Sequence, residues 1–346
     1  MTAQSPAATR VLVTGATGFL GRQVLRALMA HPRARPVAAC RNPARLPADF
    51  PGEVRSGDLL DAGYRRRVVR DVDVVCHTGT WGAFWGHADA ERTHFLEPAL
   101  DLLEQSRRAG VRRFLLASTV AVAAPSRDGS PVDDFAPPAP TGFWPHADRL
   151  IELDRRMEQT AGRDGTGMVT LRLGHFVGAG NTLGLVPALV PRLRTRLVPW
   201  LAGGRGRLAL TADTDLGEGV ALAALADGLE PYESFNICGP EFPTMREVVG
   251  FLAAETGLPA PRFSVSYGAG YAFGRLMEAL HPVLPGSSPF LTRSLVRVAE
   301  DRYCPTDYAE RKLGYVPKKD WRTAVRESLD ELRPRGFPWP RLAQRV

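Results

Sequence analysis

Three glycines near the N-terminus have the spacing of a phosphate-binding turn. Gly15, Gly18 and Gly21 follow the short apolar run Val11–Thr14 and lead into Phe19–Ala30, whose apolar residues recur at helical spacing. Glycines allow a tight turn, let backbone amides approach a pyrophosphate, and let the helix pack closely on the strand. The helix N-terminus then offers N–H groups and a partial positive charge to the phosphates. The segment TGATGFLG therefore predicts a dinucleotide site.

The residue after the second apolar run bears on which dinucleotide is bound. Pro36–Cys40 is expected to be the second parallel strand, and Arg41 follows it directly. In dinucleotide folds an acidic residue here holds the ribose 2′-hydroxyl, whereas an arginine accommodates a 2′-phosphate. Arg41, with Arg22 or Arg45 to assist it, therefore favours NADPH/NADP+ over the unphosphorylated cofactor.

Further strand and helix patterns place polar residues at one edge of a predicted sheet. Strands over Glu53–Arg55, Asp73–Cys76 and Arg113–Ala117, with a helix over about Glu91–Ala109, predict a doubly wound parallel α/β sheet of Rossmann type. Ligands bind at the carboxyl ends of such strands. The cofactor contacts predicted from these segments are Gly15, Thr17, Gly18, Phe19, Leu20, Gly21, Arg41, Asp58, Leu59, Gly79 and Ser118.

Composition narrows the class of protein further. A chain of 346 residues exceeds what one hydrophobic core usually supports, so a smaller second lobe is expected. The net charge of +7 comes from scattered arginines interleaved with Asp and Glu, which indicates solvated surfaces and no nucleic-acid partner. Four well-separated cysteines, no secretory leader and no long apolar run predict a cytoplasmic protein without a metal site or a membrane span.

The motifs in their order resemble those of the extended short-chain dehydrogenase/reductase (SDR) family over nearly the whole chain. The resemblance rests on TGATGFLG at the nucleotide turn, GDLLD at the adenine contact, VVCHTGT at the fourth strand, FLLASTVAV at the fifth strand and LRLGHFVGAGN at the nicotinamide loop. It implies a Rossmann cofactor domain and a smaller C-terminal substrate-binding domain. We expect residues 1–178 and 208–240 to form the first and residues 179–207 and 241–346 the second.

The family's acid–base pair is missing from this chain. The resemblance aligns Trp144 with the family's catalytic tyrosine and Asp148 with its lysine. No alignment changes this, because no tyrosine lies between residues 65 and 231 and no lysine precedes Lys312. Thr119 remains at the family's catalytic Ser/Thr position, and His175 lies in the nicotinamide loop. Asp148 is expected to accept hydrogen bonds from the cofactor ribose, with a cap or surface position as the alternative.

A literal Tyr-x-x-x-Lys motif occurs elsewhere, at Tyr308 and Lys312. It lies in the C-terminal part of the chain, far along the sequence from the nicotinamide loops. A motif needs its structural context to carry its chemistry. We therefore interpret it as a surface helix of the second lobe.

These absences lead to a hypothesis about the reaction. Tryptophan and an ionised aspartate are poor proton donors, and His77 or His175 would be weak acids at most. A hydroxylated polycyclic aromatic ketone can protonate its own alkoxide from a neighbouring phenol. The hypothesis is thus an NADPH-dependent ketoreductase for such a ketone. The missing pair and the arginine-rich composition also resemble atypical members of the family, and this resemblance implies an angucyclinone-like polyketide in antibiotic biosynthesis. The substrate contacts expected are Trp81, Phe84, Trp85, Thr119, Phe143, Trp144 and Phe176.

Two other classes stay open at this point. One is a non-redox isomerase, dehydratase or cyclase that keeps NADP as a structural part. The other is a binding protein that senses NADP(H) without catalysis. Consumption of NADPH in the presence of substrate separates the ketoreductase from both.

Overall fold

Alternating apolar strands and amphipathic helices form one parallel sheet with helices on both faces, as the sequence predicts. The structure is a computed structural model that describes residues 8–284 and 286–343. The sheet has seven strands in the order β10-β6-β5-β4-β1-β2-β3. They are β1 (Thr9–Thr14), β2 (Ala34–Cys40), β3 (Glu53–Ser56), β4 (Val74–His77), β5 (Arg113–Thr119), β6 (Gly167–Leu173) and β10 (Tyr232–Ile237).

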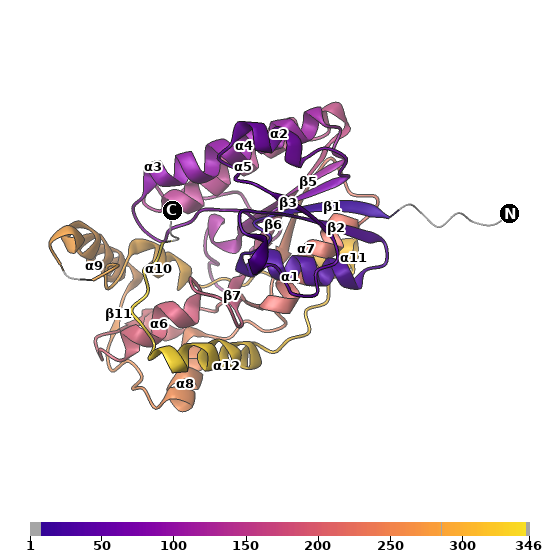
Figure 1. Cartoon of the computed structure of the whole chain (residues 1–346). Coiled ribbons are helices and arrows are strands. Elements are labelled where there is room, and N and C mark those ends of the chain that lie inside the picture. The colour runs from indigo at the N-terminus through magenta and orange to yellow at the C-terminus, as the bar shows by residue number, and fades with distance from the viewer. Residues whose placement is uncertain (1–7, 285, 344–346) are drawn as a thin grey trace.

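Two helical layers bury the sheet (Figure 1). One face carries α2 (Ala62–Val68), α4 (Glu97–Arg108) and α5 (Pro145–Thr160), and the other carries α1 (Phe19–Ala30), α7 (Asp213–Leu225) and α11 (Asp307–Leu313). The strand residues alternate between these two cores, so the strands are apolar on both faces, which is typical of parallel sheets. The doubly wound Rossmann prediction is confirmed.

A second group of elements lies beyond the carboxyl ends of the strands (Figure 1). It comprises the helices α6 (Leu185–Leu193), α8 (Met245–Thr256), α9 (Tyr267–Leu280), α10 (Arg293–Val298) and α12 (Trp321–Leu332), and the short strands β7 (His175–Val177), β8 (Trp200–Leu201), β9 (Leu210–Ala212) and β11 (Ser264–Val265). Their shared core includes Val190, Leu208, Val248 and Trp321. One part of the predicted second domain lies elsewhere, because α11 packs against β10 and α7 of the sheet.

One segment of the sheet layer departs from regular α-helix. Between α3 (Ala88–Glu91) and α4, residues Arg92–Leu96 form a π-helical turn. The sequence predicts a single helix over about Glu91–Ala109, and the structure divides it at this turn. Such turns are frequent at functional sites.

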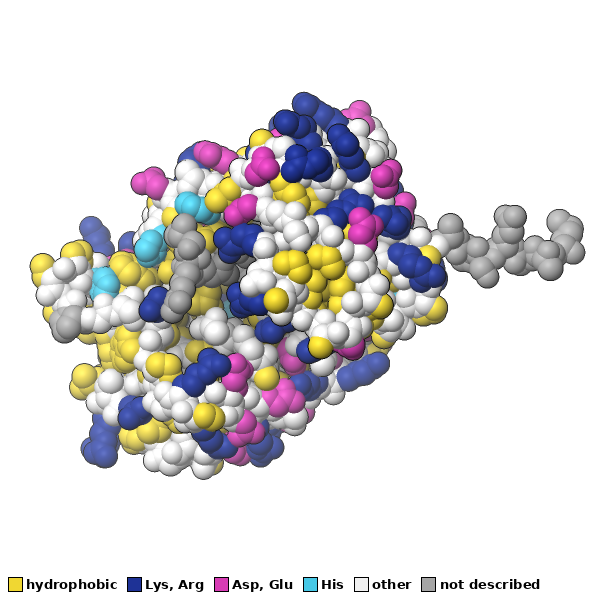
Figure 2. Space-filling model, viewed as in Figure 1, with side chains coloured by type: hydrophobic (Ala, Val, Ile, Leu, Met, Phe, Trp, Pro, Cys, Tyr) yellow, Lys and Arg dark blue, Asp and Glu magenta, His cyan; other side chains and the backbone are white. Residues whose placement is uncertain are grey.

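Charges of both signs are mixed on the surface, as the composition predicts. Figure 2 shows Lys and Arg side chains spread over the visible face with Asp and Glu among them. In the described part of the chain, no helix has the length and apolar character needed to cross a membrane. In the same residues, no group of three or more His, Cys, Asp and Glu side chains is placed to hold a metal ion.

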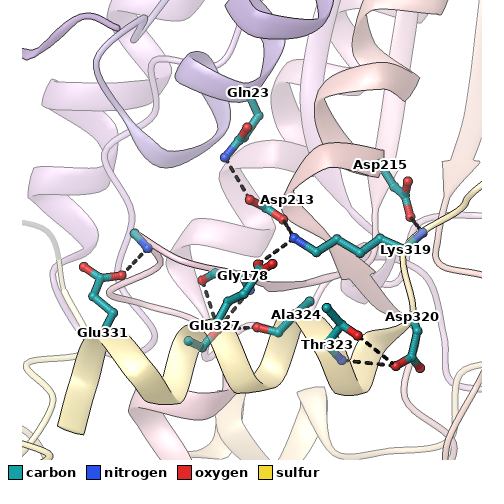
Figure 3. Close-up of polar contacts among 12 residues, drawn as sticks. Gln23, Gly178, Asp213, Asp215, Lys319, Asp320, Thr323, Ala324, Glu327 and Glu331 are labelled. Carbon is teal, nitrogen blue, oxygen red and sulfur yellow. Dashed lines mark hydrogen bonds and ion pairs between the residues drawn. The ribbon is translucent and has the colours of Figure 1, made fainter. Parts of the chain in front are cut away.

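A polar cluster ties α12 to the sheet layer (Figure 3). Lys319 Nζ lies 2.9 Å from Asp213 Oδ1, at the start of α7, and 2.5 Å from Glu327 Oε2 on α12. Gln23 Nε2, on α1, donates to the other oxygen of Asp213 at 3.0 Å. The Lys319 side chain is 19% exposed, so its charge lies mostly away from water. The ammonium group therefore links α12 to α7, and Asp213 extends the link to α1.

We expect Lys319→Met to lower the free energy of unfolding by about 1–3 kcal/mol, because Asp213 would lose a charged partner at a mostly buried position. Chemical denaturation measures this value. Lys318→Met is the matched control, since the exposed neighbour engages Asp215 only through its backbone N–H. Equal losses in the two variants would contradict the linking role of Lys319.

Candidate active site

A cavity of about 1900 Å³ opens at the carboxyl ends of the strands. Its walls are the ends of β1, β2, β4 and β5 on one side, and α6, α9 and α10 on the other. Pockets for single drug-sized ligands are roughly 300–1,000 Å³. The cavity is therefore large enough for a dinucleotide and a second molecule.

The glycine turn forms one end of this cavity. Gly15 has φ +64°, and a Cβ placed on it would lie 2.5 Å from the Cα of Gly79. A Cβ on Gly21 would lie 2.2 Å from the carbonyl oxygen of Gly15. Gly18 is the N-cap of helix α1, so the helix has no side-chain cap, and its first turn has no acidic residue. Its first N–H groups are thus available to an anion, which fits a dinucleotide pyrophosphate.

All of the cofactor contacts predicted from the strand and helix patterns line the cavity, and so does His175. Arg41 is 70% exposed, and its Nη1 lies 3.8 Å from Asp58 Oδ2. Asp58 is the one carboxylate among the described lining residues, whereas the lining arginines are Arg22, Arg41, Arg45, Arg192 and Arg341. A cavity with this excess of positive charge suits a ligand that carries phosphates.

Aromatic side chains form the middle of the cavity wall. Trp81, Phe84, Trp144 and Phe176 line it, as the sequence predicts. The rings of Phe84 and Trp144 stack with centroids 5.4 Å apart and an interplanar angle of 20°. The indole Nε1 of Trp144 donates to the carbonyl oxygen of Ala83 at 2.8 Å. The only polar hydrogen of this side chain is therefore already used within the protein.

Two of the expected aromatic contacts lie outside the cavity. Trp85 and Phe143 line a smaller neighbouring pocket. Trp85 packs edge-on against His281, with centroids 4.6 Å apart, and the guanidinium of Arg293 lies 4.9 Å from the centre of the Phe143 ring. The physical reason is packing against partners from distant segments, because His281 holds the Trp85 ring and Arg293 holds the Phe143 ring beside the smaller pocket. The substrate role predicted for these two residues is corrected accordingly.

The end of β5 offers hydroxyl groups to the cavity. Thr119 Oγ1 accepts a hydrogen bond from the backbone N–H of Ala121 at 3.2 Å, which leaves its own hydrogen free to be donated. Ser118 Oγ is buried, lines the cavity and has no partner among the described residues. A buried hydroxyl without a partner is costly unless a ligand or water satisfies it. Both hydroxyls are thus placed to contact a ligand.

Comparison with known proteins settles the family. Residues 11–238 match the NAD dependent epimerase/dehydratase family. The chain belongs to this family. A 2-alkyl-3-oxoalkanoate reductase of Stenotrophomonas maltophilia is 28% identical, with 94% of this chain and 98% of that protein covered. A 4-hydroxy-2-methyl-3-oxo-4-farnesyl-3,4-dihydroquinoline-1-oxide ketoreductase of Stigmatella aurantiaca is 26% identical over 94% and 96% of the two chains.

The same fold occurs in solved structures. The UDP-glucose 4-epimerase of Thermus thermophilus, in complex with NAD, superposes with a TM-score of 0.68 at 21% identity, over 94% of this chain and 99% of that one. The extended SDR fold expected from the motifs is thereby confirmed. The names of the two relatives, a reductase of an oxo acid and a ketoreductase, support an oxidoreductase that acts on a carbonyl group.

Asp148, at the family's lysine position, does not line the main cavity. Its Oδ1 accepts from the backbone N–H of Thr141 at 2.7 Å, and its Oδ2 accepts from that of Gly142 at 2.9 Å. The hydroxyl of Thr141 adds contacts at 3.1 and 3.3 Å. Both carboxylate oxygens thus hold the loop before α5. This corrects the ribose contact predicted for Asp148 in favour of the structural alternative.

The two histidines considered as acids are poorly suited to that role. His77 is buried away from the cavity, with Nδ1 2.9 Å from Thr14 Oγ1, and burial lowers its pKa to about 4. His175 lines the cavity, but burial, with a smaller effect from Arg302, lowers its pKa to about 3. Both rings are therefore neutral near pH 7 and lack the imidazolium proton of an acid.

The literal Tyr-x-x-x-Lys motif lies away from the cavity. Tyr308 Oη donates to Glu233 Oε2 at 2.7 Å, and Lys312 Nζ lies 3.5 Å from Glu233 Oε1. Burial and the hydrogen bond to Glu233 raise the pKa of Tyr308 to about 12. The shift is opposite to the one that a general acid near pH 7 requires. The pair anchors α11 on β10, on the sheet layer instead of the predicted second lobe.

Sequence reasoning missed one wall of the cavity. Pro338, Trp339, Arg341 and Ala343 line it, and Phe84 N donates to Leu342 O at 2.8 Å. Ala83 pairs with Ala343 in an antiparallel bridge. The segment lies outside any helix or regular strand, so periodicity gives no signal for it. The tryptophan between prolines in PWPRLA was the available clue.

We expect Asp148→Ala to lower the free energy of unfolding by about 1–3 kcal/mol, because two loop N–H groups lose a charged acceptor. The dissociation constant of NADPH should change by less than about twofold, since the carboxylate does not face the cavity. Asp148→Asn keeps one oxygen acceptor and should lose less stability. Weakened NADPH binding with unchanged stability would restore the ribose role.

Proposed function

We propose that the protein is an NADPH-dependent ketoreductase that reduces a carbonyl of a hydroxylated polycyclic aromatic ketone. The observation that carries this is Trp144, which stands at the position of the family's acid with its N–H bonded to Ala83. The family and the reductase names of the relatives support ketoreduction. The aromatic wall around Trp144 supports a flat substrate that brings its own proton.

We propose NADPH as the cofactor because arginine side chains gather around Arg41. A nicotinamide dinucleotide suits the family and the NAD-bound relatives of this fold. Arg41 and Arg45 line the cavity beyond β2, and Asp58 is not within hydrogen-bond distance of Arg41, so the guanidinium is free to contact a 2′-phosphate. We propose that Ser118 and His175 lie close to the nicotinamide half.

In the proposed reaction, the substrate itself supplies the proton that its reduced carbonyl oxygen needs. When bound, NADPH supplies the hydride that adds to the carbonyl carbon with its two electrons. The π pair of the carbonyl moves to oxygen, which takes the proton of a neighbouring phenol, so an alcohol and a phenolate remain. Thr119 donates its free hydroxyl hydrogen to the carbonyl oxygen, and the aromatic wall holds the ring system in place.

A more specific assignment follows from the same features. Within the family, the missing acid–base pair and the arginine-rich composition resemble the atypical angucyclinone ketoreductase of simocyclinone biosynthesis. We propose an angucyclinone-like polyketide as substrate, in the cytoplasm, on a route to an antibiotic.

A second candidate is reduction of a 3-oxo acid. Arg192 is buried and lines the cavity, with its Nε bonded to Phe290 O at 2.6 Å and its guanidinium over the ring of Trp339 at 4.8 Å. No described carboxylate forms an ion pair with it. A buried cation without a counterion favours an anionic ligand, and the S. maltophilia relative is named for such an acid.

We expect Arg41→Ala to raise the dissociation constant of NADPH by at least about tenfold, because a charge-assisted hydrogen bond contributes roughly 1.5–3 kcal/mol. Binding of NADH should hardly change. Fluorescence titration of both cofactors measures the ratio. Arg35→Ala, at an exposed site outside the cavity, is the control. An equal loss for both cofactors would remove the argument for the 2′-phosphate.

We expect the protein to oxidise NADPH when a peri-hydroxylated anthraquinone is present, which is measured as a loss of absorbance at 340 nm. Oxidation should be far slower with the methyl ether of that anthraquinone, because the ether has no phenolic proton. Thr119→Val should lower kcat/KM about 10–100-fold, while Thr119→Ser retains most activity. Turnover of substrate without loss of NADPH would support the non-redox alternative. Cofactor binding without any turnover would support the sensor, and faster reduction of a 2-alkyl-3-oxo acid would support the second candidate.

A further inference from the structure

A histidine–carboxylate pair lies at the same cavity wall, beside the residue that replaces the family's acid. His146 is in the first turn of α5, two positions after Trp144, and lines the cavity. Its Nδ1 lies 2.9 Å from Glu91 Oε2. Neither residue belongs to a motif of the sequence, because Glu91 comes from α3 and the pair forms only when α3 packs against α5.

Glu91 is built to hold the imidazole in one orientation. Its side chain is fully buried, and its other oxygen, Oε1, accepts from the backbone N–H of Ala83 at 2.7 Å. Both carboxylate oxygens thus have partners, and the one facing His146 requires a proton on Nδ1. No described residue forms a hydrogen bond with Nε2 of His146. That nitrogen is therefore the one available for exchange with a ligand.

The ring itself is confined on both sides. A Cβ on Gly82 would lie 3.0 Å from Cε1 and 3.2 Å from Nε2 of His146, so the glycine leaves room for the imidazole. The ring of Phe95 lies on another side, with centroids 5.6 Å apart. This confinement resembles the arrangement in which a buried carboxylate orients a catalytic histidine.

The other histidine that lines this part of the cavity has no such partner. His94 Nδ1 lies 3.2 Å from the carbonyl oxygen of Ala90 and 3.0 Å from Thr93 Oγ1. His94 therefore lacks a carboxylate to stabilise a positive ring. Of the histidines at the cavity, His146 alone in the described residues combines a buried carboxylate on one nitrogen with a free second nitrogen.

We propose that His146, oriented by Glu91, is the group that returns a proton to the substrate after hydride transfer. This rests on the proposed function, in which reduction leaves an alcohol and a phenolate. The imidazolium gives its Nε2 proton to the phenolate oxygen, the N–H bond breaks and an O–H bond forms. The neutral imidazole then takes a proton from solvent. Glu91 is a positioning residue that balances the charge on the ring.

The charged groups on α3, the π-helical turn and α5 leave this role to His146. Asp89 and Arg92, on α3 and the π-helical turn, are exposed. On α5, Asp148 holds the loop before the helix, and Arg149 pairs with Glu152 at 2.7 Å. His94 is the remaining histidine beside His146 at this wall. The pH dependence of the His146 variants distinguishes the two histidines.

Two substitutions separate the functions of the two ring nitrogens. His146→Asn keeps a donor near the position of Nδ1 for Glu91 and removes Nε2. His146→Gln keeps a donor near the position of Nε2 that does not titrate. The matched control is His31→Asn, which breaks a histidine–glutamate pair at 3.5 Å between His31 and Glu218, outside the cavity. All variants are compared as full chains for thermal unfolding and NADPH affinity.

The experiment is stopped-flow reduction of the peri-hydroxylated anthraquinone, with NADPH followed at 340 nm and the coloured phenolate in the visible. In both His146 variants we expect NADPH oxidation in the first turnover at the wild-type rate, transient phenolate, and a kcat reduced roughly 100-fold. The pH dependence of the wild-type kcat should be absent from both variants, because neither carries the ring nitrogen that transfers the proton. Glu91→Gln should lower kcat with little change in KM.

The outcomes distinguish this inference from the proposed function. A wild-type protein that oxidises NADPH with no hydroxyaryl ketone overturns both. The role of His146 alone is overturned if the wild-type protein turns over and the His146 variants match it. A match means the same kcat, no transient phenolate and the same pH profile. Retention of the pH profile in the variants would assign the proton transfer to another group, such as His94, and would overturn the role of His146.

Discussion

The backbone of Ala83 joins the walls of the cavity, and the candidate site depends on it. Its N–H donates to Glu91, its carbonyl accepts from Trp144, and the residue pairs with Ala343 of the C-terminal segment. These three contacts connect the loop after β4 to α3, to α5 and to the end of the chain. Glu91 and Trp144 are buried, so an unsatisfied group at either of them would cost roughly 1–3 kcal/mol. The positions of Phe84, Trp144 and His146 follow from this arrangement.

This arrangement explains how the fold tolerates the loss of the family's acid–base pair. The tyrosine position is filled by an indole that packs on Phe84 and donates to the protein, so no buried polar group is left without a partner. The lysine position is filled by a carboxylate that holds Thr141 and Gly142. Both replacements stabilise the start of α5. In the alignment that the motifs imply, structural side chains thus replace the family's catalytic groups, while the cavity keeps its glycine turn and its cationic lining.

The sequence predicts the parts of the molecule that local physics determines. The range Phe19–Ala30 is predicted and found as one helix, and Gly15, Gly18 and Gly21 lie where the turn requires them, because strand, turn and helix are adjacent in the chain. Trp85 is misplaced because its packing partner, His281, comes from a distant segment of the chain. Asp148 is misplaced because its nearest donors come from a loop whose path periodicity does not describe. Contacts between distant segments, such as Glu91 with His146, are not visible in one sequence.

The distribution of charge around the cavity bears on which substrates suit the site. At the dinucleotide end, arginines outnumber the single carboxylate Asp58, and phosphates would neutralise them. At the far end, Arg192 satisfies carbonyl groups of Pro289 and Phe290 but has no counterion among the described residues. Between these ends the wall is aromatic. A phenolate and a carboxylate are both anions, so each would be attracted to this cavity. The aromatic wall distinguishes the two substrates, because stacking on Trp144 and Phe84 favours a flat ring system over an alkyl chain. The aromatic wall therefore decides the order of the two candidate functions.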